Sequence, residues 1–192
     1  MTINKKTILI VSSVLVLTCL GFLVWEHQTK ETAQEQINQE KQGKDCAVQT
    51  EERIVRGTSL SPLIEPGDTV KVLFGYYNCH DVEREDIIAY NYAGNKDPII
   101  KIVKGIPGDT FALKESGSGW NILINDQILK NSEDQPYMIS GSGYKMLSLY
   151  ATDYPIIPEN TYLILSDLAT GGIDSTHFGL VDKDDILGKV EK

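Results

Sequence analysis

Two serines in one short segment could supply a nucleophile. Residues 56–68 read RGTSLSPLIEPGD and place Ser59 and Ser61 two positions apart, with Pro62 directly after the second serine. A serine hydroxyl is a weak nucleophile until a neighbouring base takes its proton. The segment is therefore either a surface turn rich in small residues or a nucleophile whose base lies elsewhere in the chain.

Histidine is the usual partner of a catalytic serine, and this chain has three histidines: His27, His80 and His177. His177 follows Asp174 closely, so composition leaves a Ser-His-Asp arrangement open. The spacing of these residues does not support that arrangement over others. A Ser-His hydrolase using His177 stays as an alternative function.

A neutral lysine can take the place of histidine. A free lysine titrates near pH 10.4, and a base that works near neutral pH needs a pKa lowered by roughly 3, at a cost of about 4 kcal/mol. Residues 98–103, PIIKIV, alternate so that Lys101 shares one strand face with Ile99 and Val103. Lys101 is therefore a candidate general base. The alternative is a lysine on an edge strand that extends its ammonium group into water.

Four segments, in this order, resemble the type I signal peptidases. Residues 57–62, GTSLSP, resemble the nucleophile box of that family, and residues 101–109, KIVKGIPGD, resemble its lysine box. Residues 82–88, VEREDII, are similar to the strand motif between them, and residues 166–181 resemble the closing box. The resemblance covers residues 54–190, and four boxes in the right order are far more specific than one.

The resemblance assigns roles to residues of this chain. It implies that Ser59 is the nucleophile and that neutral Lys101 is its general base, with an acyl-enzyme intermediate. It places the oxyanion site at Gly57 and the backbone N–H of Ser59. The family cuts secretory signal peptides after small residues at the first and third positions before the bond. It implies no cofactor and no metal. A catalytically silent relative that assembles exported subunits is a further alternative.

The closing box departs from the family pattern. The resemblance gives supporting roles to Asp167, Asp174 and Ser175. Thr176 stands where the family has arginine after the Asp-Ser pair, so Asp174 must find other hydrogen-bond donors. The serine that orients the lysine in the family aligns with Gly172, and we expect Ser175 or Thr170 as its substitute.

These side chains must be held by short strands. The β-branched or alternating runs are residues 69–74, 86–90, 98–103 and 161–166, and residues 120–129 predict a hairpin that turns near Asn125 and Asp126. Two Gly-Ser-Gly pieces, before Trp120 and Tyr144, are interpreted as turns. We therefore expect an all-β fold, a folded-over antiparallel sheet or partly open barrel of the signal-peptidase type.

The chain begins with signs of a membrane anchor. Residues 7–25 contain no charge and are long enough to cross a hydrocarbon core of about 30 Å, and Lys5 and Lys6 before them favour a cytoplasmic N-terminus. A cleavable secretory signal is the alternative. The expected organisation is a cytoplasmic tail (1–6), a single-pass transmembrane anchor (7–25), a polar stalk (26–45) and an extracytoplasmic peptidase domain (46–192).

Cysteine use and charge agree with an extracytoplasmic enzyme. Cys46 and Cys79 lie on either side of the serine segment, and an oxidising compartment permits a disulfide between them. Cys79-His80-Asp81 is weak as a metal motif because no second ligand pair follows it. The net charge of −9 argues against a nucleic-acid partner. The expected partners are signal peptides and membrane lipid.

Overall fold

The computed structural model describes Gln28, residues 46–92 and residues 97–192. The expected cytoplasmic tail (1–6), the anchor (7–25) and, apart from Gln28, the stalk (26–45) lie outside these residues. Among the helices of the described residues, none combines the length and the apolar composition that crossing a bilayer requires.

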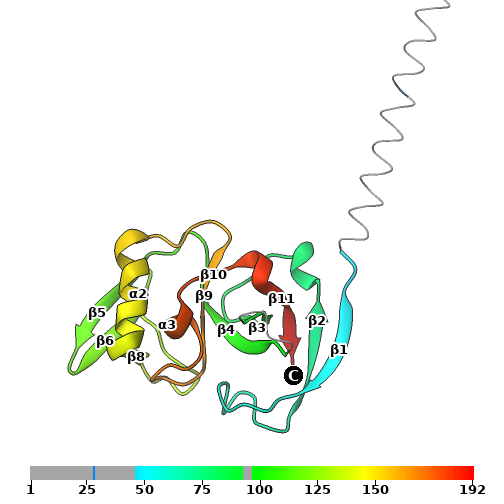
Figure 1. The fold of residues 1–192 in the computed structure, drawn as a ribbon, viewed down its shortest axis with the longest axis horizontal. Coiled ribbons are helices and arrows are strands. Elements are labelled where there is room, and N and C mark those ends of the chain that lie inside the picture. The colour runs from blue at the N-terminus through cyan, green and yellow to red at the C-terminus, as the bar shows by residue number, and fades with distance from the viewer. Residues whose placement is uncertain (1–27, 29–45, 93–96) are drawn as a thin grey trace, which may run out of the picture. The chain divides into compact units, whose positions relative to one another are not determined.

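Antiparallel strands in two sheets form the framework of residues 46–192, which confirms the predicted all-β class (Figure 1). The seven-stranded sheet has the order β1-β2-β11-β3-β4-β9-β10, and the four-stranded sheet has the order β5-β6-β7 with β8 also paired to β6. The larger sheet contains β1 (Gln49–Ile54), β2 (Thr69–Phe74), β3 (Ile87–Tyr90), β4 (Ile99–Gly105), β9 (Thr161–Leu165), β10 (Val181–Asp182) and β11 (Ile186–Glu191). The smaller sheet contains β5 (Phe111–Ser116), β6 (Gly119–Ile124), β7 (Gln127–Ile128) and β8 (Met138–Ile139).

The smaller sheet is an insertion between two neighbouring strands of the larger one. The chain leaves β4, builds β5 to β8 and α2 (Gly141–Asp153), and returns as β9, which pairs with β4. In this pairing Ile102 lies opposite Leu165 and Val103 lies opposite Ile164. Figure 1 shows β5, β6, β8 and α2 gathered at the left, and β1, β2 and β11 at the right.

Strand alternation distributes the apolar side chains of β9 between two buried clusters. Ile164 packs in a cluster with Val103, whereas Leu163 and Leu165 pack in a second cluster with Phe111. Successive side chains of a strand point to opposite faces, so both faces of β9 are covered. This explains why residues 161–165 read as a continuous apolar run.

The predicted hairpin in residues 120–129 is present, with β6 and β7 as its arms. Its turn residues, Asn125 and Asp126, have φ angles of 52° and 62°. A tight two-residue hairpin turn of this kind needs positive φ at both central positions, and asparagine and aspartate tolerate it better than most residues.

The second Gly-Ser-Gly piece begins the helix α2, so its prediction as a turn is wrong. Glycine is a poor helix former, so Gly141 and Gly143 gave no local helix signal. Leu147 of this helix is fully buried and packs in the same cluster as Phe111 and Leu165. Tertiary burial therefore outweighs the local propensity. Two short helical turns, η1 (Tyr76–Asn78) and η2 (Lys183–Asp185), and α3 (Ser175–Phe178) complete the described elements.

Candidate active site

The segment that carries the two serines connects β1 to β2 as a closed loop. Val55 donates its N–H to the carbonyl of Asp68 at 2.9 Å, and Gly67 donates to the carbonyl of Val55 at 2.8 Å. Inside the loop Leu60 and Ile64 are buried in the core of the larger sheet. The neighbouring Ser59 is thereby fixed in place, and it remains half-buried.

The two serines have different partners. The Ser61 hydroxyl donates to Glu65 Oε2 at 2.6 Å on the exposed side of the loop. The Ser59 hydroxyl lies 3.0 Å from Lys101 Nζ, although the two residues are far apart in the sequence. Of the two hydroxyls, that of Ser59 therefore has the potential base.

Lys101 lies in β4, opposite Ile88 of β3, and its exposed fraction is 3 %. Burial lowers the pKa of Lys101 to about 8, while the negative charge of Asp174 partly opposes this shift. The Lys101 amine also lies 2.8 Å from the carbonyl oxygen of Ile100. The alternative of an ammonium group extended into water does not occur.

Asp174 is fully buried at the N-terminus of α3, and its carboxylate is satisfied by other groups than an arginine. Oδ2 accepts from the Ser166 N–H at 2.9 Å, and Oδ1 accepts from the Thr176 N–H at 3.0 Å and from the Thr176 hydroxyl at 2.7 Å. Thr176 thus supplies the donors that the sequence analysis left open.

His177 takes no part in this arrangement. It lies on α3 with its side chain exposed, and its backbone N–H donates to the carbonyl of Asp174. Within residues 46–92 and 97–192, no hydrogen bond joins the His177 side chain to Asp174 or Ser59. The structure does not form the Ser-His-Asp arrangement.

Asp167, two residues after β9, holds the backbone of Ser59. Its N–H donates to the carbonyl of Ser59 at 2.7 Å. Its carboxylate accepts from the Ser132 N–H at 2.9 Å and from the Ser132 hydroxyl, and its carbonyl accepts from Asn131 Nδ2 at 3.0 Å. Asn131 and Ser132 could not be found from the sequence, because nothing in their turn-like segment marks them as neighbours of Ser59.

Three other positions named from the sequence have clear surroundings. The Ser175 hydroxyl accepts from the Ile164 N–H at 2.9 Å, and Thr170 is exposed. A Cβ atom at Gly172 would lie 2.6 Å from Ser166 Oγ. Gly172 therefore has no room for a side chain as long as Ser166 keeps its position.

The backbone N–H of Ser59 is available to donate a hydrogen bond to an oxyanion. Among the hydrogen bonds of the described residues, none uses the Ser59 N–H as donor. Gly57 is exposed, and a Cβ atom there would meet nothing within 4 Å. Backbone donors of this type stabilise the charge that develops on a carbonyl oxygen during acyl transfer.

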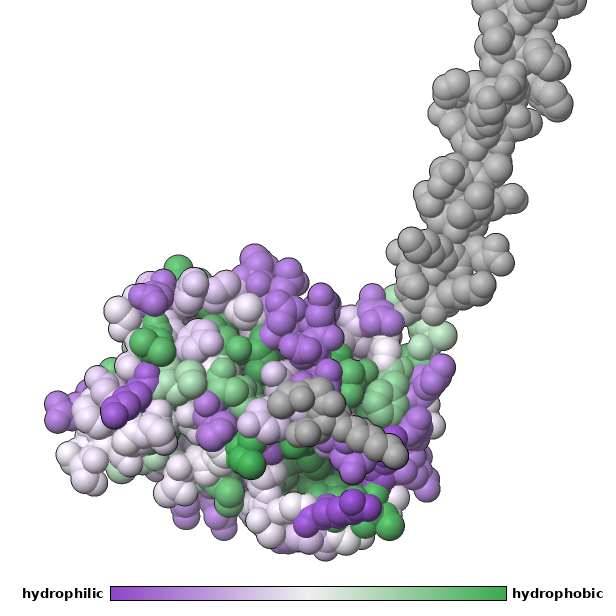
Figure 2. All heavy atoms as spheres, in the orientation of Figure 1, coloured by the Kyte–Doolittle hydropathy of each residue, from purple (hydrophilic) through white to green (hydrophobic). Residues whose placement is uncertain are grey.

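A mainly apolar cleft of about 490 Å³ opens beside Ser59 and Lys101. One wall is the backbone that leads from β1 to the nucleophile, and the other is the start of β4. The lining residues are Glu52 to Gly57, Ser59, Leu60, Val70, Val72, Ala89 and Asp97 to Lys101. Figure 2 shows that apolar side chains reach the surface of the module between hydrophilic ones.

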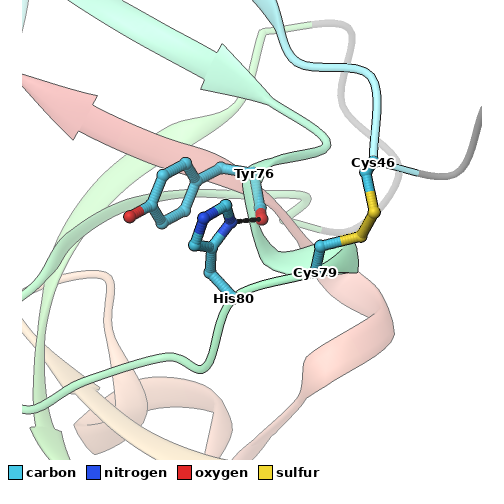
Figure 3. The surroundings of a disulfide bond; sticks show 4 residues. All are labelled: Cys46, Tyr76, Cys79 and His80. Atoms are coloured by element: carbon cyan, nitrogen blue, oxygen red, sulfur yellow. Dashed lines mark hydrogen bonds between the residues drawn. A yellow bond between two sulfur atoms is a disulfide. The ribbon is translucent and has the colours of Figure 1, made fainter. Parts of the chain in front are cut away.

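Cys46 and Cys79 form a disulfide, with their Cα atoms 5.5 Å apart (Figure 3). The bridge ties Cys46, three residues before β1, to Cys79, the residue after η1. Beside it, the ring of His80 stacks on that of Tyr76 at 4.0 Å, and His80 Nδ1 lies 2.8 Å from the carbonyl oxygen of Tyr76. Cys79 is therefore not available as a thiolate ligand. No group of three or more candidate metal ligands occurs in the part of the chain that the structure describes.

Comparison with known proteins identifies the family. Residues 46–192 match the family described as "Signal peptidase, peptidase S26". The chain belongs to this signal peptidase family. Membership makes it a serine-type endopeptidase.

The relatives of this signal peptidase include named signal peptidases of other bacteria. The chain is 29% identical over 150 residues to signal peptidase IB of Staphylococcus aureus (strain COL), covering 71% of this chain and 73% of that protein. The chain is also 28% identical over 148 residues to signal peptidase I of Bacillus caldolyticus, and the match covers 72% of this chain and 75% of that protein. A crystal structure of a signal peptidase I from Enterococcus faecalis matches with 25% identity and a TM-score of 0.40, covering 57% of this chain and 97% of that one.

Proposed function

We propose that this signal peptidase removes signal peptides from exported preproteins, with Ser59 as nucleophile and Lys101 as general base. The observation that carries the proposal is the 3.0 Å contact between the Ser59 hydroxyl and a buried amine whose pKa is lowered to about 8. The relatives named signal peptidase support the substrate class.

The reaction proceeds in two halves. In the first, neutral Lys101 accepts the Ser59 proton, Ser59 Oγ attacks the scissile carbonyl, and the Ser59 N–H donates to the oxyanion. The Lys101 ammonium then gives its proton to the leaving amine, and an ester of Ser59 remains. In the second half, Lys101 takes a proton from water, the hydroxide attacks the ester, and Ser59 is released with its proton restored.

The cleft suits an extended peptide. Residues 99–101 of β4 pair with β3 on one side, whereas the pairing with β9 begins at Ile102. The other edge of residues 99 and 100 faces the position of a strand that an extended substrate can supply. The substrate presents small residues at the first and third positions before the bond, as the family resemblance implies.

Membrane attachment and lipid contact belong to the same proposal. The predicted anchor (7–25) keeps the enzyme in the membrane that its substrates cross, which raises their effective concentration without tight binding. Ile54, which lines the cleft, has an exposed fraction of 67 %, and Ile173, close to Asp174 in sequence, has 55 %. We expect these exposed apolar side chains to contact lipid on the extracytoplasmic face.

The test is cleavage of a synthetic signal peptide by the full-length protein in detergent, with the cut site mapped by mass. We expect Ser59→Ala and Lys101→Ala to lower the rate by about 10³-fold or more, and Ser61→Ala, the matched control, to retain activity. Full activity of Ser59→Ala contradicts the proposal. A loss confined to His177→Ala supports the Ser-His alternative.

The silent-relative alternative has its own signature. If the wild-type protein cleaves no signal peptide, and neither Ser59→Ala nor Lys101→Ala changes processing of exported proteins in cells, an assembly factor is the better interpretation.

A further inference from the structure

One buried hydroxyl near the dyad has no partner. Ser166, directly after β9, is fully buried, and its Oγ is the buried side-chain polar atom left without a hydrogen bond among the described residues. Leaving a buried polar group unsatisfied is destabilising, and native proteins keep few such groups. Stability alone therefore does not account for a serine at position 166.

Strand register places Ser166 beside the general base. Ile102 lies opposite Leu165, and Val103 lies opposite Ile164. One further step in the same register brings Lys101 opposite Ser166. Residues directly opposite each other in an antiparallel pair point to the same face of the sheet.

The nucleophile is close to the same point of the chain. The N–H of Asp167, the residue after Ser166, donates to the carbonyl of Ser59 at 2.7 Å. The residue before Asp167 therefore sits where the strand of the base and the loop of the nucleophile meet.

A count of donors shows what the hydroxyl can do. Lys101 Nζ has two hydrogen-bond partners among the described residues, Ser59 Oγ and the carbonyl of Ile100. After it takes the Ser59 proton, the amine is an ammonium group with three donors. One donor then lacks an acceptor, and the Ser166 hydroxyl is an acceptor that lacks a donor.

We propose that Ser166 is a positioning residue whose hydroxyl accepts the third hydrogen bond of the Lys101 ammonium and keeps it aimed at Ser59. The inference rests on the proposed function. The substitutes expected from the sequence fit less well, because the Ser175 hydroxyl is already bonded to the Ile164 N–H and Thr170 is exposed.

The Ser166 side chain also restricts position 172 to glycine. A Cβ atom at Gly172 would lie 2.6 Å from Ser166 Oγ and 3.4 Å from Ser166 Cβ. The first distance is a clash, whereas the second is tight but close to ordinary contact. A serine therefore fits at position 172 only when position 166 is a residue without a hydroxyl, such as alanine.

Because positions 166 and 172 cannot both carry a hydroxyl, single and double variants of the full-length protein in detergent test the inference. We expect Ser166→Ala to lower kcat for the synthetic signal peptide by about 10- to 100-fold, the loss of one hydrogen bond to a charged group, with KM within about twofold. Gly172→Ser alone should also lower kcat, because it displaces the Ser166 hydroxyl. The double variant Ser166→Ala/Gly172→Ser should recover at least about tenfold over Ser166→Ala, because a hydroxyl returns to the same space.

Thermal unfolding separates positioning from structure. At pH 9.5, where folded Lys101 is neutral, Ser166→Ala removes no hydrogen bond of the structure, so its Tm should equal or exceed that of the wild type. Ser175→Ala is the matched comparison, because it removes the acceptor of the Ile164 N–H and should lower Tm. A wild-type kcat in Ser166→Ala, or a loss of kcat that follows a fall in Tm, overturns the inference.

A titration of Lys101 by NMR does not depend on proteolysis. Because an acceptor stabilises the ammonium form, Ser166→Ala should lower the pKa of Lys101 below its wild-type value. If the wild-type protein cleaves no signal peptide but this fall is observed, the proposed function fails while the contact stands. An unchanged pKa together with an unchanged kcat rejects the contact itself.

Discussion

Replacing Lys101, the proposed general base, should make the protein inactive and more stable. Lys101→Met keeps the length of the side chain and removes its charge, and Lys101 is almost completely buried. The charged form of Lys101 is what burial penalises, since desolvation is the main cause of its lowered pKa. The same penalty should therefore appear as a stability cost of the wild-type protein.

The size of this cost follows from the two pKa values. Lys101 falls from 10.5 to about 8 on folding, and at pH 7 this difference destabilises the folded state by about 3 kcal/mol. Methionine leaves Ser59 Oγ and the carbonyl of Ile100 without the amine, which offsets about 1–2 kcal/mol. The expected net gain of Lys101→Met is about 1–2 kcal/mol at pH 7.

The sign of the pH dependence is fixed by linkage. The folded pKa of Lys101 lies below the unfolded one, so between about pH 8 and 10.5 the unfolded chain binds more protons and stability rises with pH. From pH 7 to 9.5 this one group should add about 2 kcal/mol to the free energy of unfolding of the wild type. Lys101→Met lacks the contribution altogether.

Urea unfolding of both full-length proteins in detergent at pH 7, 8 and 9.5 measures the effect. Subtracting the two curves cancels the other titrating groups, and the advantage of Lys101→Met should shrink by about 2 kcal/mol over this range. A difference that stays constant with pH means that Lys101 titrates alike in both states. The reasoning would then be refuted, because Ser59 would have no neutral amine near it at neutral pH.

Three further changes test the surroundings of the dyad. If Lys101 is the base, kcat/KM should rise with pH through the pKa of Lys101. Asp174→Asn should move this rise to lower pH, because the charge of Asp174 raises that pKa. A rise that stays in place or moves to higher pH contradicts this. Replacing Cys46 and Cys79 together by serine should lower the free energy of urea unfolding by about 2–4 kcal/mol, and an unchanged midpoint would contradict a closed bridge. Thr176→Val should cost about 1–2 kcal/mol in calorimetry, because the Asp174 carboxylate loses a hydroxyl donor; a Tm equal to that of the wild type argues against this role.

Local patterns were enough to predict much of the fold, whereas the choice of Ser59 and Lys101 as candidate reactive groups came from the family resemblance. The alternation around Lys101 placed its side chain on an apolar face, and the structure shows it buried. Asn125 and Asp126 marked a hairpin turn, because few residues adopt positive φ readily. In these cases the physical cause lies within a few residues of the position it affects.

Features that depend on distant partners were not predictable in the same way. Leu147 is buried by strands of the smaller sheet, and no local signal announced the helix that carries it. The pairing of β4 with β9 brings Ser166 to Lys101, but two apolar strands separated by an inserted lobe do not reveal their register. The hydrogen bonds from Asn131 and Ser132 to Asp167 have the same origin.

The link between Asp167 and the inserted lobe has a consequence for how this enzyme can vary. Asn131 and Ser132 hold Asp167, and Asp167 holds the carbonyl of Ser59, whereas none of the three lines the cleft. If Ser59 is the nucleophile, as proposed, substitutions at Asn131 and Ser132 should change the turnover rate and leave the choice of peptide unchanged. Related enzymes would then differ in turnover rate through the segment between β4 and β9 and in peptide preference through the cleft. Selection can act on these two properties separately.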